Sequence, residues 1–228
     1  MTSREIVQRT LDFAGPERVA RSFPGDSDFA HAHPTVKTHA TEWEEVSPGT
    51  WRRTDEWGNE WHRIDATSKG EVSRGVLDDI TKIDAYEFPD FSAPADYDNI
   101  RDIAAKNPDT WIIGGLPGFA FNVARKLRKL DQYLMDIILE RDTMHALHDR
   151  IDAVLTDMII NHADAGVNAV MFPEDWGTQA QTLVSPELWK EEFYPRFEKL
   201  CALAHDRGVR VFMHSCGKIE AIVPGLMA

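Results

Sequence analysis

The spacing of apolar and polar residues predicts alternating helices and buried strands over the second half of the chain. Apolar residues recur with a helical period in three long segments, 118–139, 143–164 and 186–207. Short segments that are apolar almost throughout lie before, between and after them, at 111–113, 167–172 and 209–213. Strands without a polar face are typical of a parallel sheet that helices cover on both sides. The pattern therefore predicts an α/β fold, and it leaves open either a barrel or a doubly wound sheet.

The first half of the chain has a weaker pattern. Residues 3–13 have apolar positions close to helical spacing before Gly15-Pro16, whereas residues 16–40 show no clear period. Between residues 42 and 64, tryptophans recur around Ser-Pro-Gly and Gly-Asn turns, which predicts a β-hairpin. Further helices are expected at 78–86, at 96–106 and from about residue 218. We expect a single domain over 1–228, with the hairpin as an embellishment near its N-terminus.

The helix predicted at 186–207 has a defined start and an irregular point. Ser185 is a preferred N-cap residue, and Pro186 suits the first helical position. Pro195 falls inside the helix, where the missing N–H predicts a kink.

The predicted parallel strands are too few to close a barrel. A (β/α)₈ barrel needs more strands than are expected here, and the chain reaches Ala228 shortly after the last predicted helix begins. Unpaired sheet edges are sites of association. A barrel of this length would be incomplete at its C-terminus, so we expect either a longer natural chain or pairing between chains in a homo-oligomer.

Composition narrows the range of partners. The 228 residues carry 25 Lys+Arg against 38 Asp+Glu, a formal charge of −13. Nucleic acid requires a basic surface, and the densest basic run, at 125–129, is expected to be one solvated helix face. The longest stretch without charge, 110–124, contains glycines and a proline and is shorter than the roughly 20 apolar residues that span a bilayer. We expect no nucleic-acid partner and no membrane span.

The two cysteines occupy different settings. Two are too few for a disulfide scaffold in a chain of this length, which favours a reducing compartment and a cytoplasmic protein. Cys201 is expected in the middle of a helix as a small buried core residue. Cys216 follows a predicted strand, two residues after His214, and alternate residues of extended chain project to the same side. An imidazole and a thiolate in this arrangement suit zinc, whose catalytic sites use three protein ligands, so a further ligand must come from elsewhere.

A second polar segment, Pro173 to Gln179, follows the neighbouring predicted strand at the same end of the sheet. Adjacent residues point in different directions, so Glu174 and Asp175 are not expected to face one atom together. Either carboxylate is a candidate acid, base or metal ligand, and the alternative is that it caps the next turn or helix. Gly177 indicates close approach of the backbone, either to a ligand or to another loop.

The motifs DEWG (55–58), FPD (88–90), DWGTQ (175–179), SPELW (185–189) and MHSCGKI (213–219) as a group resemble the uroporphyrinogen decarboxylase-like superfamily. More narrowly, they resemble its corrinoid-linked methyltransferase branch. The resemblance implies a (β/α)₈ TIM barrel in which His214 and Cys216 bind Zn²⁺, with a third cysteine ligand beyond Ala228. It also implies that the loop holding the candidate catalytic residues Glu174 and Asp175 lines the barrel mouth, with candidate substrate contacts at Trp176, Gly177 and Gln179. The tryptophan-rich hairpin, including Trp57, either forms a wall of that mouth or serves only to hold the hairpin together.

Three functions follow from this resemblance. The first is zinc-dependent methyl transfer between a corrinoid on a partner carrier protein and a small thiol, pterin or methoxylated substrate. The second is decarboxylation of a tetrapyrrole, but true decarboxylases carry an arginine-rich N-terminal segment where this chain has only Arg18 and Arg21. The third is a corrinoid-binding module without catalysis. We expect the first, because it uses the His214 and Cys216 pair.

Overall fold

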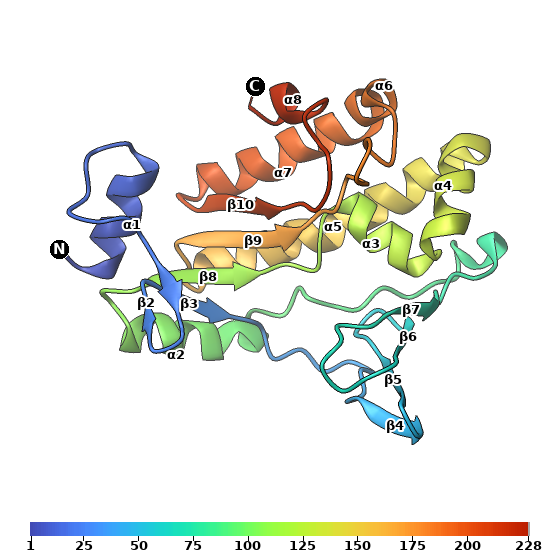
Figure 1. Ribbon diagram of the computed structural model, residues 1–228, viewed down its shortest axis with the longest axis horizontal. Coiled ribbons are helices and arrows are strands. Elements are labelled where there is room, and N and C mark those ends of the chain that lie inside the picture. The colour runs from blue at the N-terminus through green and yellow to red at the C-terminus, as the bar shows by residue number, and fades with distance from the viewer. Residues whose placement is uncertain (228) are drawn as a thin grey trace.

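The computed structural model describes residues 1–227, and a parallel sheet lies at its centre (Figure 1). Four strands form this sheet: β3 (Phe29–Ala32), β8 (Trp111–Gly115), β9 (Ala169–Pro173) and β10 (Arg210–His214). Their order in space, β3-β8-β9-β10, follows their order along the chain, and every pair is parallel. The predicted α/β fold with a parallel sheet is confirmed. Within residues 1–227 the sheet stays open, with β3 and β10 at its edges.

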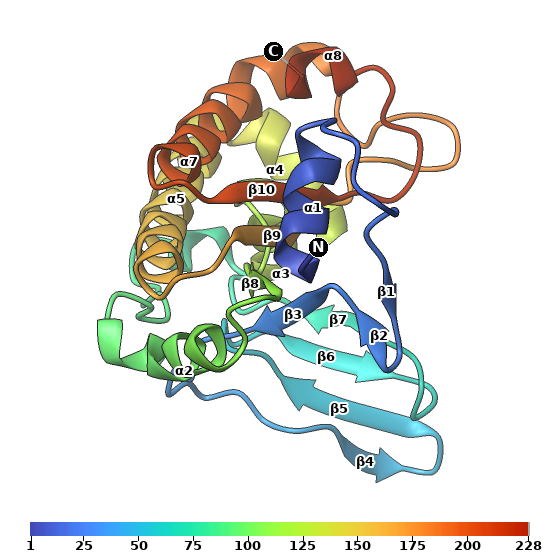
Figure 2. The same cartoon turned by 90° about the vertical axis from the view of Figure 1, so that its left-hand side faces the viewer.

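Helices cover one face of the parallel sheet, on the left in Figure 2. They include α2 (Asp98–Lys106), α5 (Arg141–Asp164) and α7 (Tyr194–Asp206). The core on this side contains the strand residues Ile112, Val170 and Phe172. The opposite face is covered by α1 (Ser3–Leu11), whose Val7 packs with Trp111, Ile113 and Ala169. Burial on both faces explains why β8 and β9 are apolar almost throughout.

The helix expected at 118–139 is two helices, α3 (Ala120–Leu127) and α4 (Leu130–Leu139). The chain turns between them at Lys129, which has a φ of 63°. Arg128 secures this turn, since its buried guanidinium donates to the Asp136 carboxylate at 2.7 Å and also to the Leu77 carbonyl oxygen. Apolar spacing continues across the break, so the period alone did not reveal it.

The helix expected at 186–207 is divided as well. It consists of α6 (Pro186–Leu188), a π-helical turn η3 (Trp189–Phe193) and α7. Ser185 is the N-cap as predicted, because its Oγ accepts the Leu188 N–H at 3.1 Å. The π-helical turn ends two residues before Pro195, whose missing N–H cannot bond the carbonyl group one turn earlier.

Two of the shorter predicted helices are reduced to single turns. Residues 78–86 contain only the 3₁₀ turn η1 (Ile80–Lys82), and the helix expected from 218 is α8 (Val223–Leu226). The segment 96–106 is helical as predicted, with the 3₁₀ turn η2 (Pro94–Tyr97) leading into α2. None of the helices in the described part of the chain combines the length and apolar character that crossing a membrane requires.

The segment 16–40, for which no element was predicted, contains β3. Its sequence alternates alanine and histidine after Phe29 and offers little contrast between apolar and polar positions. The strand forms because it pairs with β8, with Ala32 opposite Gly114. The two-residue strands β1 (Ser22–Phe23) and β2 (Asp26–Ser27) form a short antiparallel pair just before it.

The tryptophan-rich segment forms a four-stranded antiparallel sheet rather than the predicted hairpin at 42–64. Its strands, in consecutive order, are β4 (Glu44–Ser47), β5 (Thr50–Thr54), β6 (Glu60–Arg63) and β7 (Glu71–Arg74). The fourth strand was missed because Val72 is its one apolar residue. Asp65 organises the turn before this strand by accepting the N–H groups of Thr67 and Ser68, both at 2.8 Å.

One buried histidine joins the helical layer to the parallel sheet. A Cβ atom at Gly114 would lie 2.2 Å from His162 Cδ2, so the ring of this α5 residue fits only against glycine. His162 is fully buried against Tyr97, and its Nδ1 lies 2.8 Å from the Met158 carbonyl oxygen. Burial lowers the pKa of His162 to about 4.

We predict that His162 makes the fold less stable in mild acid. The unfolded chain binds a proton at this residue below about pH 6.5, whereas the folded protein resists protonation down to about pH 4. The free energy of unfolding should therefore fall as the pH is lowered through this window, by on the order of 3 kcal/mol from this residue. Urea unfolding across the window measures the decline. His162→Phe should make it shallower, His205→Phe at an exposed position of α7 should not, and an equally steep decline in His162→Phe would contradict the prediction.

Candidate functional site

The two polar loops predicted from the sequence lie side by side at the carboxyl ends of β9 and β10. Pro173 pairs with His214 in the last register position of these strands. Beyond it, the Glu174 N–H donates to the His214 carbonyl oxygen at 2.8 Å, and the Gly177 N–H donates to the Cys216 carbonyl oxygen at 3.2 Å. The Lys218 N–H closes the series by donating to the Thr178 carbonyl oxygen at 2.7 Å. The parallel pairing of the strands thus continues into the loops as an irregular ladder.

Two glycines allow this contact. Gly217 has a φ of 81°, and a Cβ atom there would lie 2.3 Å from the Gly177 carbonyl carbon. A Cβ atom at Gly177 would lie 2.5 Å from the Lys218 nitrogen. The close backbone approach expected at Gly177 is therefore made to the neighbouring loop.

Three potential metal-ligating side chains converge above this contact. His214 Nε2 lies 3.3 Å from Cys216 Sγ and 3.7 Å from Asp175 Oδ1. All three ligand atoms lie within 4.8 Å of one another. Asp175 is half-buried, and the other two residues are exposed. We call Asp175, His214 and Cys216 the triad.

The triad suits zinc in both chemistry and spacing. Zinc accepts nitrogen, sulfur and oxygen ligands at about 2.0–2.3 Å, which places tetrahedral ligand atoms roughly 3.3–3.7 Å apart. The two distances from His214 Nε2 fall within that range. A donor set of one imidazole, one thiol and one carboxylate also matches the mixed ligands of catalytic zinc sites, which keep a further position open.

The Asp175 carboxylate interacts with both Cys216 and Arg125. Burial raises the pKa of Asp175, but hydrogen bonds from the Cys216 N–H and thiol, together with Arg125, outweigh this and leave the pKa below its ordinary value. Asp175 Oδ1 accepts the Cys216 N–H at 2.9 Å, and Oδ2 lies 3.3 Å from Arg125 Nη2. The hydrogen bond to Asp175 and its negative charge raise the pKa of the Cys216 thiol. Binding of a metal ion must therefore displace the thiol proton.

Glu174 faces away from the triad and into the protein. Its fully buried carboxylate accepts the backbone N–H groups of Phe119 at 2.7 Å and Asn122 at 3.1 Å, at the N-terminus of α3. Burial raises the pKa of Glu174 to about 8, although these hydrogen bonds oppose the rise. Of the two candidate carboxylates, only Asp175 belongs to the triad. Glu174 caps a helix, but this helix is the earlier α3 and not the next turn or helix that was considered for it.

Trp57 and Trp176, the two tryptophans expected near the substrate, do not expose their rings at the protein surface. Trp176 is fully buried, stacked on Phe121 with ring centroids 4.2 Å apart. Trp57 is buried between Phe88 and Phe91 and borders a cavity described below. Both indoles therefore serve mainly as hydrophobic anchors. Gln179 is exposed in a tight turn next to Thr178, whose N–H bonds the Gln181 carbonyl oxygen.

Arg125 is the residue at this site that the sequence did not reveal. The run 125–129 was expected to be solvated, yet Arg125 is partly buried against Asp175 and Arg128 is nearly fully buried. Arg125 and Asp175 are 50 residues apart in the sequence, so their contact leaves no local sequence pattern. Only the packing of α3 against the loop after β9 brings the guanidinium to the carboxylate.

We predict that Asp175 slows alkylation of Cys216 in the metal-free protein. The reactive species is the thiolate, and Asp175 raises the pKa of this thiol. In a Cys201→Ser background, Asp175→Asn should move the pH profile of the reaction with iodoacetamide to lower pH and raise the rate severalfold near neutrality. Asp164→Asn, at the exposed end of α5, is the matched control. An unchanged profile in Asp175→Asn would show that the carboxylate does not act on the thiol.

We also predict that the two-glycine contact is costly to disturb. Gly208 and Gly217 both have positive φ, but a Cβ atom at Gly208 would meet no atom within 4 Å. Gly208→Ala therefore measures the backbone strain alone, about 1–2 kcal/mol. Gly217→Ala adds a collision with backbone and should lower the free energy of unfolding by about 1–3 kcal/mol more. Equal losses in urea unfolding would mean that the loops are not in tight contact.

Comparison with known proteins yields one family and a similar solved structure. Residues 65–228 match the sequence model described as uroporphyrinogen decarboxylase (URO-D). A solved methyltransferase from Methanosarcina mazei is 19% identical over 57% of this chain and 37% of that chain, with a TM-score of 0.49. The present chain thus spans well under half the length of that methyltransferase. A search of curated proteins gives no match.

Proposed function

The chain belongs to the uroporphyrinogen decarboxylase family, and on this premise we propose that it is a zinc-dependent methyltransferase of the wider superfamily. The observation that carries the proposal is the triad at the carboxyl ends of two neighbouring parallel strands. Carboxyl ends of parallel strands are where α/β folds place their active sites. A decarboxylase would have no use for an exposed thiol and imidazole held at metal-ligand spacing.

We further propose that the parallel sheet is one half of a (β/α)₈ barrel. Support comes from its strand order, which follows the chain without the reversal that marks a doubly wound sheet. The loops after β9 and β10 would then lie at the barrel mouth. In this arrangement Asp175, His214 and Cys216 are the proposed zinc ligands contributed by this chain.

The roles of the chain's own residues follow from their contacts. Arg125 binds Asp175 Oδ2 and leaves Oδ1 directed at the other two members of the triad, His214 and Cys216. Such a partner fixes the orientation of a ligand. Bound zinc would supply Lewis acidity, lowering the pKa of a coordinated thiol or polarising an ether oxygen so that a methyl group can be transferred.

The proposed partners are a corrinoid on a separate carrier protein and a small thiol, pterin or methoxylated substrate. The exposure of the His214 and Cys216 side chains supports access by a bulky cofactor. The carrier would dock over the loops after β9 and β10. Trp176 and Glu174 hold the first of these loops from below, by packing and by hydrogen bonding respectively.

Tetrapyrrole decarboxylation is the second candidate function, and the matching family description favours it. It requires cationic groups that hold substrate carboxylates and no metal ion. The two candidates therefore differ in whether zinc is bound at the triad and in whether activity depends on it.

We predict that the full chain binds one equivalent of zinc. Cys216→Ser and Asp175→Asn should each weaken zinc affinity by tenfold or more, since each removes a ligand atom or its charge. Cys201→Ser is the matched control, because Cys201 lies on α7 away from the triad and should retain zinc. Elemental analysis after dialysis and competition with a chromogenic chelator give the stoichiometry and affinity.

Two results would overturn the zinc proposal. One is a wild-type protein that binds no zinc under reducing conditions. The other is a Cys216→Ser variant that binds zinc as tightly as Cys201→Ser does. In either case the decarboxylase candidate would be tested next, with a tetrapyrrole substrate and added chelator.

A further inference from the structure

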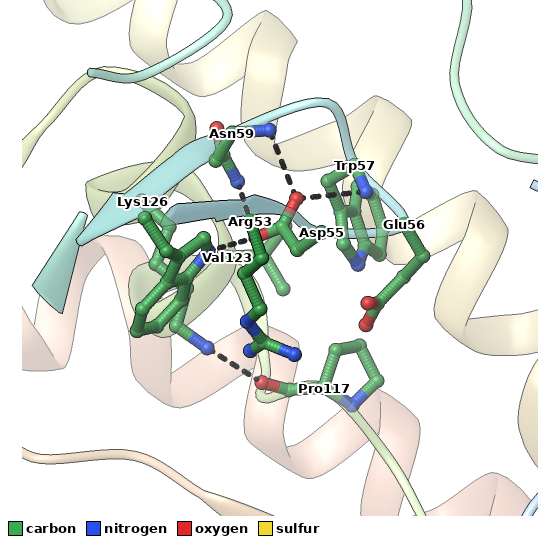
Figure 3. Close-up of a pocket in the computed structure, with 9 residues that line it drawn as sticks. Arg53, Asp55, Glu56, Trp57, Asn59, Pro117, Val123 and Lys126 are labelled. Carbon is green, nitrogen blue, oxygen red and sulfur yellow. Dashed lines mark hydrogen bonds between the residues drawn. The ribbon is translucent and has the colours of Figure 1, made fainter. Parts of the chain in front are cut away.

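A small cavity lies between the antiparallel sheet and α3, apart from the triad (Figure 3). Its volume is about 120 Å³. Arg53, Asp55 and Glu56 border it from the sheet, and Pro117 and Lys126 border it from the segment after β8 and from α3. The volume is several times that of a water molecule but far below the roughly 300 Å³ of a complete ligand pocket. It can therefore hold one chemical group of a ligand, or a small ion.

Two cationic side chains extend into this cavity without an anionic partner. The Arg53 guanidinium lies between the rings of Trp43 and Trp61, 5.1 and 5.2 Å from their centroids. Its Nε is buried and has no hydrogen-bond partner. Lys126 Nζ donates only to the Pro117 carbonyl oxygen, at 3.3 Å. Among residues 1–227, neither cation forms an ion pair.

The two nearby carboxylates do not neutralise these cations by contact. Asp55 is buried and accepts four N–H donors of its own turn: Trp57 N, Asn59 N, Asn59 Nδ2 and Trp61 Nε1. Its hydrogen-bonding capacity is used within the sheet. Glu56 is exposed, and its carboxylate forms no ion pair with either cation. The cavity therefore presents N–H donors without a bound acceptor.

Partial burial of these two cations carries a desolvation cost. Each side chain is half-buried and loses part of its hydration, which a neutral hydrogen bond does not fully replace. Burial and the neighbouring Arg125 accordingly lower the pKa of Lys126. An oxygen anion between the two side chains would receive charge-assisted hydrogen bonds from both.

We propose that this cavity binds a small oxyanion, the carboxylate or phosphate group of a small molecule. Arg53 and Lys126 are its binding residues, and the flanking tryptophan rings hold the guanidinium in place. The cavity includes none of the triad residues. Anion binding in this cavity can therefore be tested independently of zinc binding and of methyl transfer.

Titration of the full chain with inorganic phosphate and with acetate tests the proposal, with sodium chloride at equal ionic strength as reference. Calorimetry and tryptophan fluorescence report binding, since Trp57 and Trp61 border the cavity. We expect saturable binding of at least one of the two anions and no response to chloride. A phosphate-only or acetate-only response identifies which group the site prefers. No saturable binding of either anion would overturn the proposal.

Variants distinguish anion binding in this cavity from non-specific attraction of anions to positive charge. Lys126→Met should weaken the anion about tenfold or more, because it removes a charged donor. Lys106→Met, on the exposed surface of α2, is its matched control. Arg53→Gln should act like Lys126→Met, whereas Arg52→Gln on the exposed face of the same strand should not.

Glu56→Gln is expected to have the opposite effect on anion affinity. Loss of this exposed carboxylate beside the cavity should tighten anion binding, because it removes repulsion without removing a donor. Circular dichroism confirms that each variant is folded before it is titrated. Wild-type affinity in both Lys126→Met and Arg53→Gln would overturn the assignment of these residues, even if anions bind elsewhere.

Discussion

The candidate site depends on the contact between the loops that follow β9 and β10. Gly177 and Gly217 meet backbone to backbone, at a distance that no side chain would permit. Because the loops touch there, the hydrogen bonds between their main chains can form, and Asp175 comes within reach of His214 and Cys216. If the loops were separated by the width of a methyl group, the three ligand atoms would no longer converge.

Three consecutive residues give the first of these loops its shape. Glu174 turns inward and caps α3 through two backbone N–H groups. Asp175 turns outward to the triad, and Trp176 turns inward again to stack on Phe121. The loop is thus fixed at two buried points on either side of an exposed carboxylate, which gives that carboxylate a defined position without burying it.

Several cationic side chains lie near the site, although the chain as a whole is acidic. The chain carries −13, yet Arg125 lies against Asp175, and both Lys69 and Arg125 lower the pKa of the Cys216 thiol against the effect of Asp175. Arg53 and Lys126 add two further cations at the cavity beside α3. Positive charge concentrated in one region of an acidic protein attracts anionic ligands to that region. This setting favours the proposed oxyanion site, whereas a zinc ion, itself a cation, would depend on the negative charge of Asp175 and of a Cys216 thiolate.

The sequence alone predicted strands β8, β9 and β10, the helical segments that cover them and the proximity of His214 and Cys216, because apolar period and strand alternation are local properties. It did not determine the division of 118–139, which depends on a hydrogen bond from Arg128 to Leu77 far earlier in the chain. It also left open which of Glu174 and Asp175 would face the site, since adjacent residues differ only in the direction that packing gives them. Tertiary structure decided this, by burying Trp176 and by bringing Arg125 and the second loop to Asp175. Contacts between distant segments carry no periodic signature, and for that reason only the folded chain reveals them.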